Sequence, residues 1–471
     1  MLILLQINFF SQLYLNKTNT FTIISGGTAI MKKKVGIILL CIMLVVSSIS
    51  IFQMKQIKAT GKTSGEWWNY EWNYRKLITI NSSQVDSTLS NFPVLINLAS
   101  DPDLVAHAQP DGDDIVFILD SDNTKLNHEI ELFNGTKGQL IAWVNVTSLS
   151  GSTDTEIYMY YGNSTCSSQE NVAGVWDSNY IAVWHLSETP TVDKYAYDST
   201  SNSNNGTFEG NMTYDDQVTG QIDGCLDFDG LDDNVDLPDG VSSLLGGASA
   251  ATISVWTKRS TIGTRDSIID LTITSIYSKM YLEFQADNKV RVGGRANSSD
   301  TFQSEITNST FLSNTWYNIV GILNIANDDI IIYNNGKNQP TNGSPSWKQT
   351  TFDANVGWKH AIGTAAAVIN SHAGQIDEVQ ISKVARNASW IKTSYNTMNS
   401  PSTFISVGKE EVRAKIIVSD PYPPDGAINV ELNPTMSIYV NHYLGYPMNI
   451  TWKWNNSGSW DVFGTNYKVF D

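Results

Sequence analysis

The sequence is short of charged residues, and of basic ones above all. Of its 471 residues 16% are charged, against roughly 25% in an ordinary soluble protein. Lys and Arg number 30 and Asp and Glu 47, which gives a formal net charge of −17. Because nucleic-acid binding depends on clustered positive charge, this balance argues against a nucleic-acid partner. The excess of carboxylates instead suits divalent cations and solubility outside the cell.

Cysteine is scarce too, with three in the chain. Cys41 lies in an apolar N-terminal run, which leaves Cys166 and Cys225. Two cysteines in an exported chain can pair with each other, but they cannot form a disulfide framework. Cys225 sits in an alternating strand pattern, which favours a buried free thiol over a disulfide.

The residues that fill these gaps favour β-structure. Hydrophobic residues make up 41% of the chain, with 14 Trp and 20 Tyr, so wholesale disorder is excluded. Aromatic and β-branched residues favour strands, and the many Asn, Ser, Thr and Gly residues favour turns. The composition therefore predicts an all-β protein of the extracellular kind.

The N-terminus predicts export. Three lysines at 32–34 precede an uncharged apolar run at 35–52, which is the pattern of a signal peptide or a membrane anchor. The run just reaches bilayer-spanning length, so both alternatives stay open. We expect residues 31–59 to form this segment, to be the only contact with a membrane, and to place the rest of the protein outside the cell. Residues 1–30 precede it and are expected to be an upstream extension, with translation starting at Met31.

From residue 31 onward, twelve Asn-x-Ser/Thr sequons would suit a glycosylated surface protein. A chain rich in Asn, Ser and Thr also forms such triplets by chance, so this support is weak. The sequons begin at Asn81, Asn134, Asn145, Asn163, Asn205, Asn211, Asn297, Asn308, Asn342, Asn387, Asn449 and Asn455.

Strand patterns divide the rest of the chain into tandem β-sandwiches. Short apolar runs between turn signals predict a first sandwich at residues 72–162. A Ser/Asn/Gln-rich linker at 163–171 leads to a second strand-dense block at 172–411, which predicts a large jelly roll. Asn335-Gly336 predicts a type I′ hairpin in this block, and 388–395 a short helix. We expect the linker to let the two blocks fold separately.

A proline-rich junction opens the last segment, residues 420–471. Its length holds a few strands only, whereas a β-sandwich needs about seven strands over about 100 residues. We therefore expect a truncated domain there.

The first sandwich resembles an uncharacterised β-domain of bacterial and archaeal surface proteins. The order and spacing of the matching stretches agree along the whole block. No activity is known for that family, so the resemblance implies no catalytic residue. Among the matching stretches are Trp72-Asn73-Tyr74-Arg75-Lys76, Asp111-Gly112-Asp113-Asp114, His128-Glu129-Ile130-Glu131 and Tyr158-Met159-Tyr160-Tyr161-Gly162-Asn163.

The second block resembles the LamG-like members of the concanavalin A-like lectin/glucanase superfamily. The resemblance implies a jelly roll, with carbohydrate binding or glucanase activity as the functions to test. The segment after Asp420 resembles the Ig-like repeats of prokaryotic surface proteins. The stretches that match LamG-like domains include Val183-Trp184-His185-Leu186, Asp198-Ser199-Thr200-Ser201-Asn202, Leu226-Asp227-Phe228-Asp229-Gly230 and Gly374-Gln375-Ile376-Asp377-Glu378.

Catalysis lacks a sequence signature. Glucanases of this superfamily carry Glu-x-Asp-x-x-Glu or a close variant on one strand, and residues 180–411 contain none. Glu129 and Glu131 have a suitable spacing but are better explained as a solvated strand edge. The six histidines show no zinc-ligand spacing, and His185 is interpreted as a satisfied core residue. We therefore predict that the protein is not an enzyme.

A structural calcium ion is the one cofactor that the sequence predicts. Asp198, Asn202 and Asn204 gather oxygen-bearing side chains in one loop, as calcium requires. The resemblance adds Asp377, since jelly rolls of this superfamily often bind calcium through an Asp of a late strand. The acidic run 227–233 is a rival site, and an ordinary polar turn is the simplest alternative.

We predict a cell-surface binding or adhesion protein that recognises a glycan or another surface protein. Sugar binding needs exposed aromatic rings, and Trp347, Trp358 and Trp390 are in suitable surroundings, although buried tryptophan is commoner, so the ligand residues stay unassigned. Two alternatives remain. One is the non-catalytic part of a polysaccharide-active enzyme whose catalytic domain lies beyond residue 471; the other is a structural stalk or surface-layer component.

Overall fold

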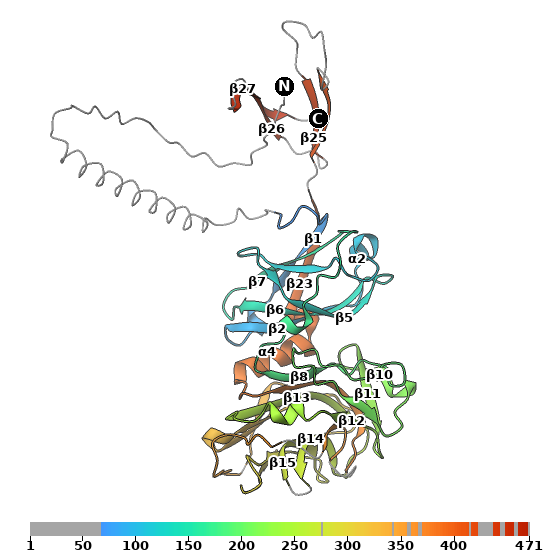
Figure 1. The fold of residues 1–471 in the computed structure, drawn as a ribbon, viewed down its shortest axis with the longest axis vertical. Helices are drawn as coiled ribbons and strands as arrows, with labels where there is room; N and C mark the ends of the chain where they lie inside the picture. Colours follow the sequence, from blue (N-terminus) through green and yellow to red (C-terminus); the bar gives the residue numbers. More distant parts are fainter. Residues whose placement is uncertain are drawn as a thin grey trace, which may run out of the picture. The chain divides into compact units, whose positions relative to one another are not determined.

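The computed structural model describes residues 67–274, 277–341, 343–355, 359–365 and 370–413, and four strands beyond them (Figure 1). Residues 67–411 form one compact unit, and the chain after them belongs to a second. The predicted export segment and the upstream extension lie outside the described residues. Among those described, no helix has the length and apolar character needed to cross a membrane.

Eight strands and one helix form the first sandwich of the large unit. One sheet has five strands in the order β23-β1-β7-β3-β4, and the other has three in the order β2-β6-β5. The elements are β1 (Tyr74–Ile80), β2 (Leu89–Leu98), α2 (Pro102–His107), β3 (Val116–Leu119), β4 (Lys125–Leu126), β5 (His128–Asn134), β6 (Gln139–Leu149), β7 (Thr155–Tyr161) and β23 (Ile405–Val412).

The jelly roll packs two larger sheets against each other. One runs β10-β11-β22-β13-β18-β19-β20, with β8 also paired to β22, and the other runs β17-β16-β15-β14-β21-β12-β9. The strands are β8 (Tyr180–Trp184), β9 (Thr207–Glu209), β10 (Gln217–Thr219), β11 (Gly224–Asp229), β12 (Asn234–Leu237), β13 (Ala250–Arg259), β14 (Asp266–Thr274), β15 (Tyr277–Phe284), β16 (Val290–Gly294), β17 (Gln303–Ile306), β18 (Tyr317–Asn324), β19 (Asp329–Asn334), β20 (Lys337–Gln339), β21 (Lys359–Ile362) and β22 (Ala373–Ser382).

Few helices interrupt the strands, so the predicted all-β class is confirmed. The helix expected at 388–395 is longer, Ala388–Asn399 (α4), and the Asn335-Gly336 hairpin joins β19 to β20 with positive φ at both residues, as a type I′ turn requires. The other helical elements are η2 (Ser82–Gln84), η3 (Val172–Gly174), η4 (Tyr214–Asp216), α3 (Gly240–Ser243), η5 (Ile325–Asn327) and α5 (Pro401–Phe404).

One hydrophobic cluster contains residues of both sandwiches, which the sequence did not predict, and we call it the shared core. Phe92 of β2 packs edge-on against Trp390 of α4, with ring centroids 4.8 Å apart, and Phe404 is fully buried in the same cluster. The backbone N–H of Leu95 donates to Thr397 Oγ1 at 3.1 Å. The last strand of the range assigned to the jelly roll, β23, lies beside β1 in the first sandwich.

The blocks are packed against each other, and their separate folding stays a prediction. The linker at 163–171 is polar, but it is bonded to the first sandwich: the N–H groups of Gln169 and Asn171 donate to the carbonyls of Asp113 and His128 at 3.1 and 3.0 Å. A polar linker composition therefore says nothing about which apolar surfaces meet on either side of it.

The second unit contributes two antiparallel strand pairs. β24 (Ile416–Tyr422) pairs with β25 (Ser437–His442), and β26 (Met448–Asn455) pairs with β27 (Trp460–Val469). The Ig-like domain expected at 420–471 stays a prediction.

A buried histidine should make the jelly roll acid-sensitive. His360 on β21 is 1% exposed, and burial lowers its pKa to about 4. Below pH 6.5 the unfolded chain takes up a proton that the folded chain rejects, so stability falls with falling pH. As the pH falls from 6.5 to 5, His360 should lower the free energy of unfolding by about 2 kcal/mol. Urea unfolding of His360→Gln against the wild type should show that difference; parallel pH curves would contradict it.

Candidate functional site

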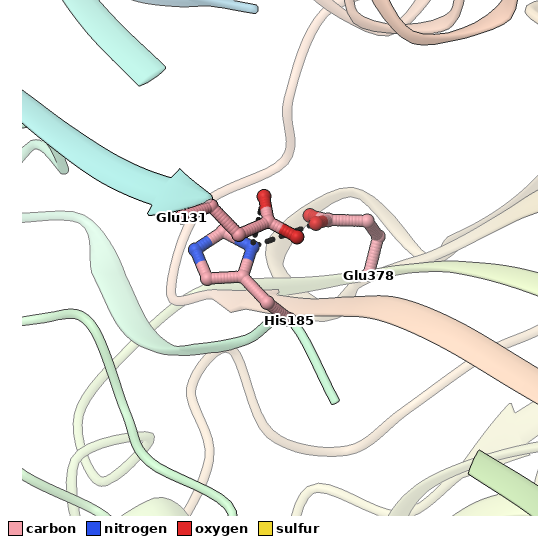
Figure 2. A group of neighbouring side chains, drawn as sticks. All are labelled: Glu131, His185 and Glu378. Atoms are coloured by element: carbon pink, nitrogen blue, oxygen red, sulfur yellow. Dashed lines mark hydrogen bonds and ion pairs between the residues drawn. The ribbon is translucent and has the colours of Figure 1, made fainter. Parts of the chain in front are cut away.

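Three glutamates surround one histidine where the first sandwich meets the jelly roll. Figure 2 shows two of them, Glu131 and Glu378, beside His185. Glu129 and Glu131 come from β5, His185 directly follows β8, and Glu378 lies on β22. His185 Nδ1 is 2.6 Å from Glu378 Oε1 and 3.5 Å from Glu131 Oε2. On the other side of the ring, Nε2 is 3.3 Å from Glu129 Oε1. We call these four residues the interface cluster.

The interface cluster is buried. The side chains of Glu378, Glu131, His185 and Glu129 are 0%, 2%, 7% and 9% exposed. Taking charged groups out of water is costly unless they are paired and hydrogen-bonded. Three carboxylates face a single imidazole here, so pairing within the cluster leaves an excess of negative charge.

Each carboxylate of the cluster is held by further donors. Two indole N–H groups are among these donors, and the Trp143 ring also stacks on His185 with centroids 5.8 Å apart. Fixed donors of this kind set where each carboxylate oxygen points. The bonds are Trp143 Nε1 to Glu131 Oε2 at 2.9 Å, Trp176 Nε1 to Glu129 Oε2 at 3.0 Å, Ser199 Oγ to Glu129 Oε1 at 2.5 Å and Gln380 Nε2 to Glu378 Oε2 at 3.3 Å.

The backbone is bent to bring two of these residues together. Glu378 has φ +51° inside β22, where the register between β13 and β22 shifts as in a β-bulge. Leu186, next to His185, has φ +60°. A left-handed conformation is unfavourable for both residue types. Bulges and strained residues of this kind often occur at functional sites, where they redirect a side chain.

Burial and proximity shift the pKa values within the cluster. Burial raises the pKa of Glu131 to about 8, against the opposing effect of His185. For His185, burial favours the neutral ring, but Glu378, Glu131 and Glu129 together raise its pKa well above the usual value. Burial would also raise the pKa of Glu129, yet His185 and the bonds from Ser199 and Trp176 lower it. These shifts favour the protonated form of Glu131 and the protonated form of His185, which contacts Glu378 and Glu129.

The sequence interpretation of Glu129 and Glu131 was wrong, whereas His185 is buried as the sequence predicted. Glu129 and Glu131 are not a solvated strand edge, because β5 lies against the jelly roll and both side chains are buried. His185 is a core residue, as expected, but its partners are three carboxylates. The i, i+2 spacing was a correct signal that both glutamates share a region, but their partners lie about 55 and 250 positions further along the chain.

The predicted calcium ligands lie in two separate hydrogen-bonded settings. Asp198 accepts from the N–H of Val183 and Thr200 through Oδ1, at 3.0 and 2.9 Å, and from the N–H of Asn204 through Oδ2, at 2.7 Å. The amides of Asn202 and Asn204 each donate to the Ile181 carbonyl at 2.9 Å. This loop is thus closed by protein donors.

Asp377 is held by another loop. Its Oδ2 accepts from the N–H groups of Gln221 and Ile222 at 2.8 and 2.9 Å, and its Oδ1 is buried without a hydrogen-bond partner. In the rival run, Asp229, Asp232 and Asp233 each bring one carboxylate oxygen within 4.8 Å of the others. Calcium binding by Asp198, Asn202, Asn204 and Asp377 stays a prediction.

That prediction has a direct test. If the four residues bind calcium, saturating calcium at a hundredfold excess over Kd stabilises the folded state by about 2.7 kcal/mol. Melting in the presence of a chelator and of calcium measures this, and Asp198→Asn should remove the response. If the melting temperature is the same with calcium and with chelator, the loop binds no calcium and is an ordinary Asx-type turn.

Of the three tryptophans considered for sugar stacking, two are unsuitable. Trp347 is 7% exposed within the jelly-roll core and Trp390 is 9% exposed in the shared core. Trp358 lies outside the described residues.

An aromatic pair that the sequence did not single out lies on the outer face of the seven-stranded sheet. On β15, Met280 and Leu282 point into the core, so Tyr281 and Glu283 point to the other face. The rings of Tyr281 and Phe302 stack in parallel with centroids 5.6 Å apart; Tyr281 is 5% exposed and Phe302, which covers it, is 36% exposed. In Figure 1 this strand lies at the end of the jelly roll away from the first sandwich.

Arginines frame that aromatic pair. The guanidinium of Arg291 is 5.3 Å from the Tyr281 ring centroid, and that of Arg295 is 5.8 Å from Phe302. Glu283 binds Arg291 at 2.6 Å and Arg265 at 2.7 Å. We call the set of Tyr281, Phe302, Glu283 and the three arginines the outer-face patch.

Two family models match the chain, and the first match crosses the boundary between the two blocks. Residues 111–221 match the model described as "Domain of unknown function (DUF2341)", and residues 228–392 match that of the concanavalin A-like lectin/glucanases superfamily. The chain thus carries a DUF2341 domain followed by a concanavalin A-like domain, in the expected order. No curated protein matches the chain.

Several solved structures are similar to parts of the chain. Domain 4 of AbnA, an extracellular GH43 arabinanase from Geobacillus stearothermophilus, solved with arabinotriose, is 17% identical, with a TM-score of 0.37; the match covers 46% of this chain and 98% of that domain. The CBM40 of the Ruminococcus gnavus IT-sialidase, bound to α2,3 sialyllactose, is 11% identical, with a TM-score of 0.31 and coverage of 36% and 96%.

Proposed function

We propose that the protein is an exported, non-catalytic surface protein that binds an oligosaccharide at the outer-face patch. The observation that carries the proposal is the exposed ring of Phe302, which is stacked on the buried ring of Tyr281 and set among arginines on a sheet face that is turned away from the core. The family match to lectin-type domains supports the same class of ligand.

The patch has the chemistry that sugars require. An aromatic ring packs on the apolar face of a pyranose, and guanidinium and carboxylate groups form paired hydrogen bonds with neighbouring hydroxyls. Arg265 and Arg291 pair with Glu283, and Asp270 is opposite Tyr281 in the β14–β15 register. With Arg295 over Phe302, three arginines accompany these two carboxylates. Because positive charge is in excess, we expect sugars that carry a carboxylate to bind better than neutral ones.

Burial argues against glycoside hydrolysis at the interface cluster. A retaining glycosidase needs two carboxyl groups about 5–5.5 Å apart, and Glu131 and Glu378 bring oxygens within 4.8 Å of each other. Both side chains are at most 2% exposed, so a polysaccharide has no access to them. The basic and apolar run near the N-terminus supports the export part of the proposal.

Phe302→Ala tests the proposed site. The change removes a partly exposed ring, so the fold should survive while affinity falls roughly tenfold or more, as for other central aromatic contacts. A glycan array should first identify ligands for the wild type, and titration calorimetry should then compare the variants. Tyr214→Ala is the matched control, because Tyr214 is an exposed aromatic, at 67%, outside the patch.

Two outcomes would refute the proposal. One is wild-type protein that binds no glycan on an array with neutral and acidic sugars. The other is equal affinity of Phe302→Ala and Tyr214→Ala for the ligand that the wild type selects.

A further inference from the structure

We propose that the interface cluster binds a first-row divalent metal ion, zinc in the first place, through Glu131, His185 and Glu378. The ion would join the two sandwiches, because Glu131 belongs to the first and the other two ligands to the jelly roll. This site is separate from the outer-face patch and does not depend on glycan binding.

The donor atoms are already gathered. One oxygen from each glutamate and one ring nitrogen of His185 lie within 4.8 Å of one another, and Figure 2 shows the three side chains converging from different segments. Zinc binds nitrogen and carboxylate oxygen at about 2.0–2.2 Å. Tetrahedral ligands around it are therefore roughly 3.4 Å apart, which is within the 4.8 Å that separates the three donor atoms at most.

An unsatisfied atom points to a ligand that is not part of the chain. Glu131 Oε1 has no hydrogen-bond partner, and the Glu131 side chain is buried, at 2% exposed. Buried polar atoms in native proteins are almost always satisfied by protein, water or an ion. With Oε2 of the same carboxylate held by Trp143, Oε1 is available to complete the coordination of a metal.

The surroundings of His185 match those of metal-binding histidines. Such histidines usually direct the second ring nitrogen to a carboxylate, which fixes the ring and its tautomer. Here His185 Nε2 faces Glu129 Oε1 at 3.3 Å, and Ser199 and Trp176 fix that carboxylate in turn. Nδ1 is then the nitrogen that binds the metal. The metal replaces the proton that lies between Nδ1 and Glu378 in the hydrogen bond.

The ligand types select the ion. An imidazole with two carboxylates suits zinc and other first-row metals, whereas calcium and magnesium prefer oxygen alone. A divalent cation also balances the buried carboxylates, which outnumber the one imidazole by three to one. The ligands are buried, so the role that we assign to the metal is to stabilise the contact between the sandwiches.

Metal titration of the full chain tests the site. Protein freed of metal with a chelator should retain about one equivalent of zinc after gel filtration. At a hundredfold excess over Kd, zinc should raise the melting temperature by roughly 5 °C, and calcium should not reproduce the effect at these residues. Cobalt should give a visible absorption band that reports nitrogen and oxygen ligands.

Conservative variants separate metal binding from folding. Glu131→Gln retains the size of the side chain and an oxygen for Trp143, so the metal-free protein should melt at the wild-type temperature or above it, without retaining zinc. His185→Gln should also lose zinc and the cobalt band. The matched control is His360→Gln, since His360 is an equally buried histidine outside the cluster and its variant should bind zinc normally.

Wild-type protein that retains less than about a tenth of an equivalent of zinc, cobalt or manganese would overturn the proposal. Glu131→Gln that keeps both the bound zinc and the cobalt spectrum would overturn it equally. Because the cobalt band is recorded on the wild type, the result does not depend on whether each variant folds.

Discussion

A chain ended at Asn399 is expected to lose the first sandwich, although every other strand of that sandwich is more than 230 residues earlier in the sequence. The truncation removes α5 and β23, and with them the strand beside β1 and the fully buried Phe404. It also removes Glu411, which pairs with the buried Arg75 at 2.7 Å. Loss of a buried Phe side chain alone costs roughly 3–5 kcal/mol, a large part of the usual 5–15 kcal/mol of a domain.

The comparison needs a control chain that ends at Arg413 and keeps β23. Thermal unfolding followed by circular dichroism should give one cooperative transition for the control and a lower, broader one for the shorter chain. Hydrogen exchange should show rapid exchange in β1 and β7 of the shorter chain. Equal melting temperatures of the two chains would mean that β23 does not stabilise the sheet.

Replacing Arg386 by Met is expected to cost about 3 kcal/mol of unfolding free energy. The guanidinium binds Asp177 with two bonds, at 2.8 and 3.0 Å, and lies between the rings of Tyr180 and Trp390 at 4.4 and 4.2 Å. Arg386 is 8% exposed, so the loss leaves Asp177 without its partner and empties the space between the rings. Urea unfolding measures the change.

Arg386→Lys separates charge from shape. Lysine keeps the charge but lacks the flat fork, so it should recover less than half of the loss. Asp177→Asn in combination with Arg386→Met should cost clearly less than the sum of the single changes, because the two side chains act as a pair. Additive effects would show that stacking alone holds Arg386 in place.

The sequence predicted elements whose cause is local. Alternating apolar residues predicted the strands, and Asn335-Gly336 predicted its turn because both positions need positive φ. The family motifs placed a concanavalin A-like domain after a DUF2341 domain, as the family models show, and the structure gives the two sheets of the first sandwich. The membership of β23 in the first sheet was not predictable this way, because its alternation fits any sheet and its partner β1 is more than 320 positions away.

The interface cluster shows the same limit for sites. Glu129 and Glu131 carried a recognisable spacing, but their burial depends on contact with the jelly roll, and Glu378 turns inward only because of a bulge. The oxygen-rich loop of Asp198 predicted a calcium site, which stays a prediction. The structure shows four protein donors on the Asp198 carboxylate.

The pairing of β1 with β23 determines how the unit would respond to a pulling force. Arg75, near the start of β1, contacts Glu411, near the end of β23, so the chain enters and leaves the unit at the same end of adjacent strands. Tension on the flanking segments would open this pair one hydrogen bond after another, like a zipper, rather than shear all the bonds at once. Until the β1–β23 pair opens, the force is carried by these two strands alone and does not act across the jelly roll. A ligand bound at the outer-face patch would therefore not be pulled off by tension on the chain.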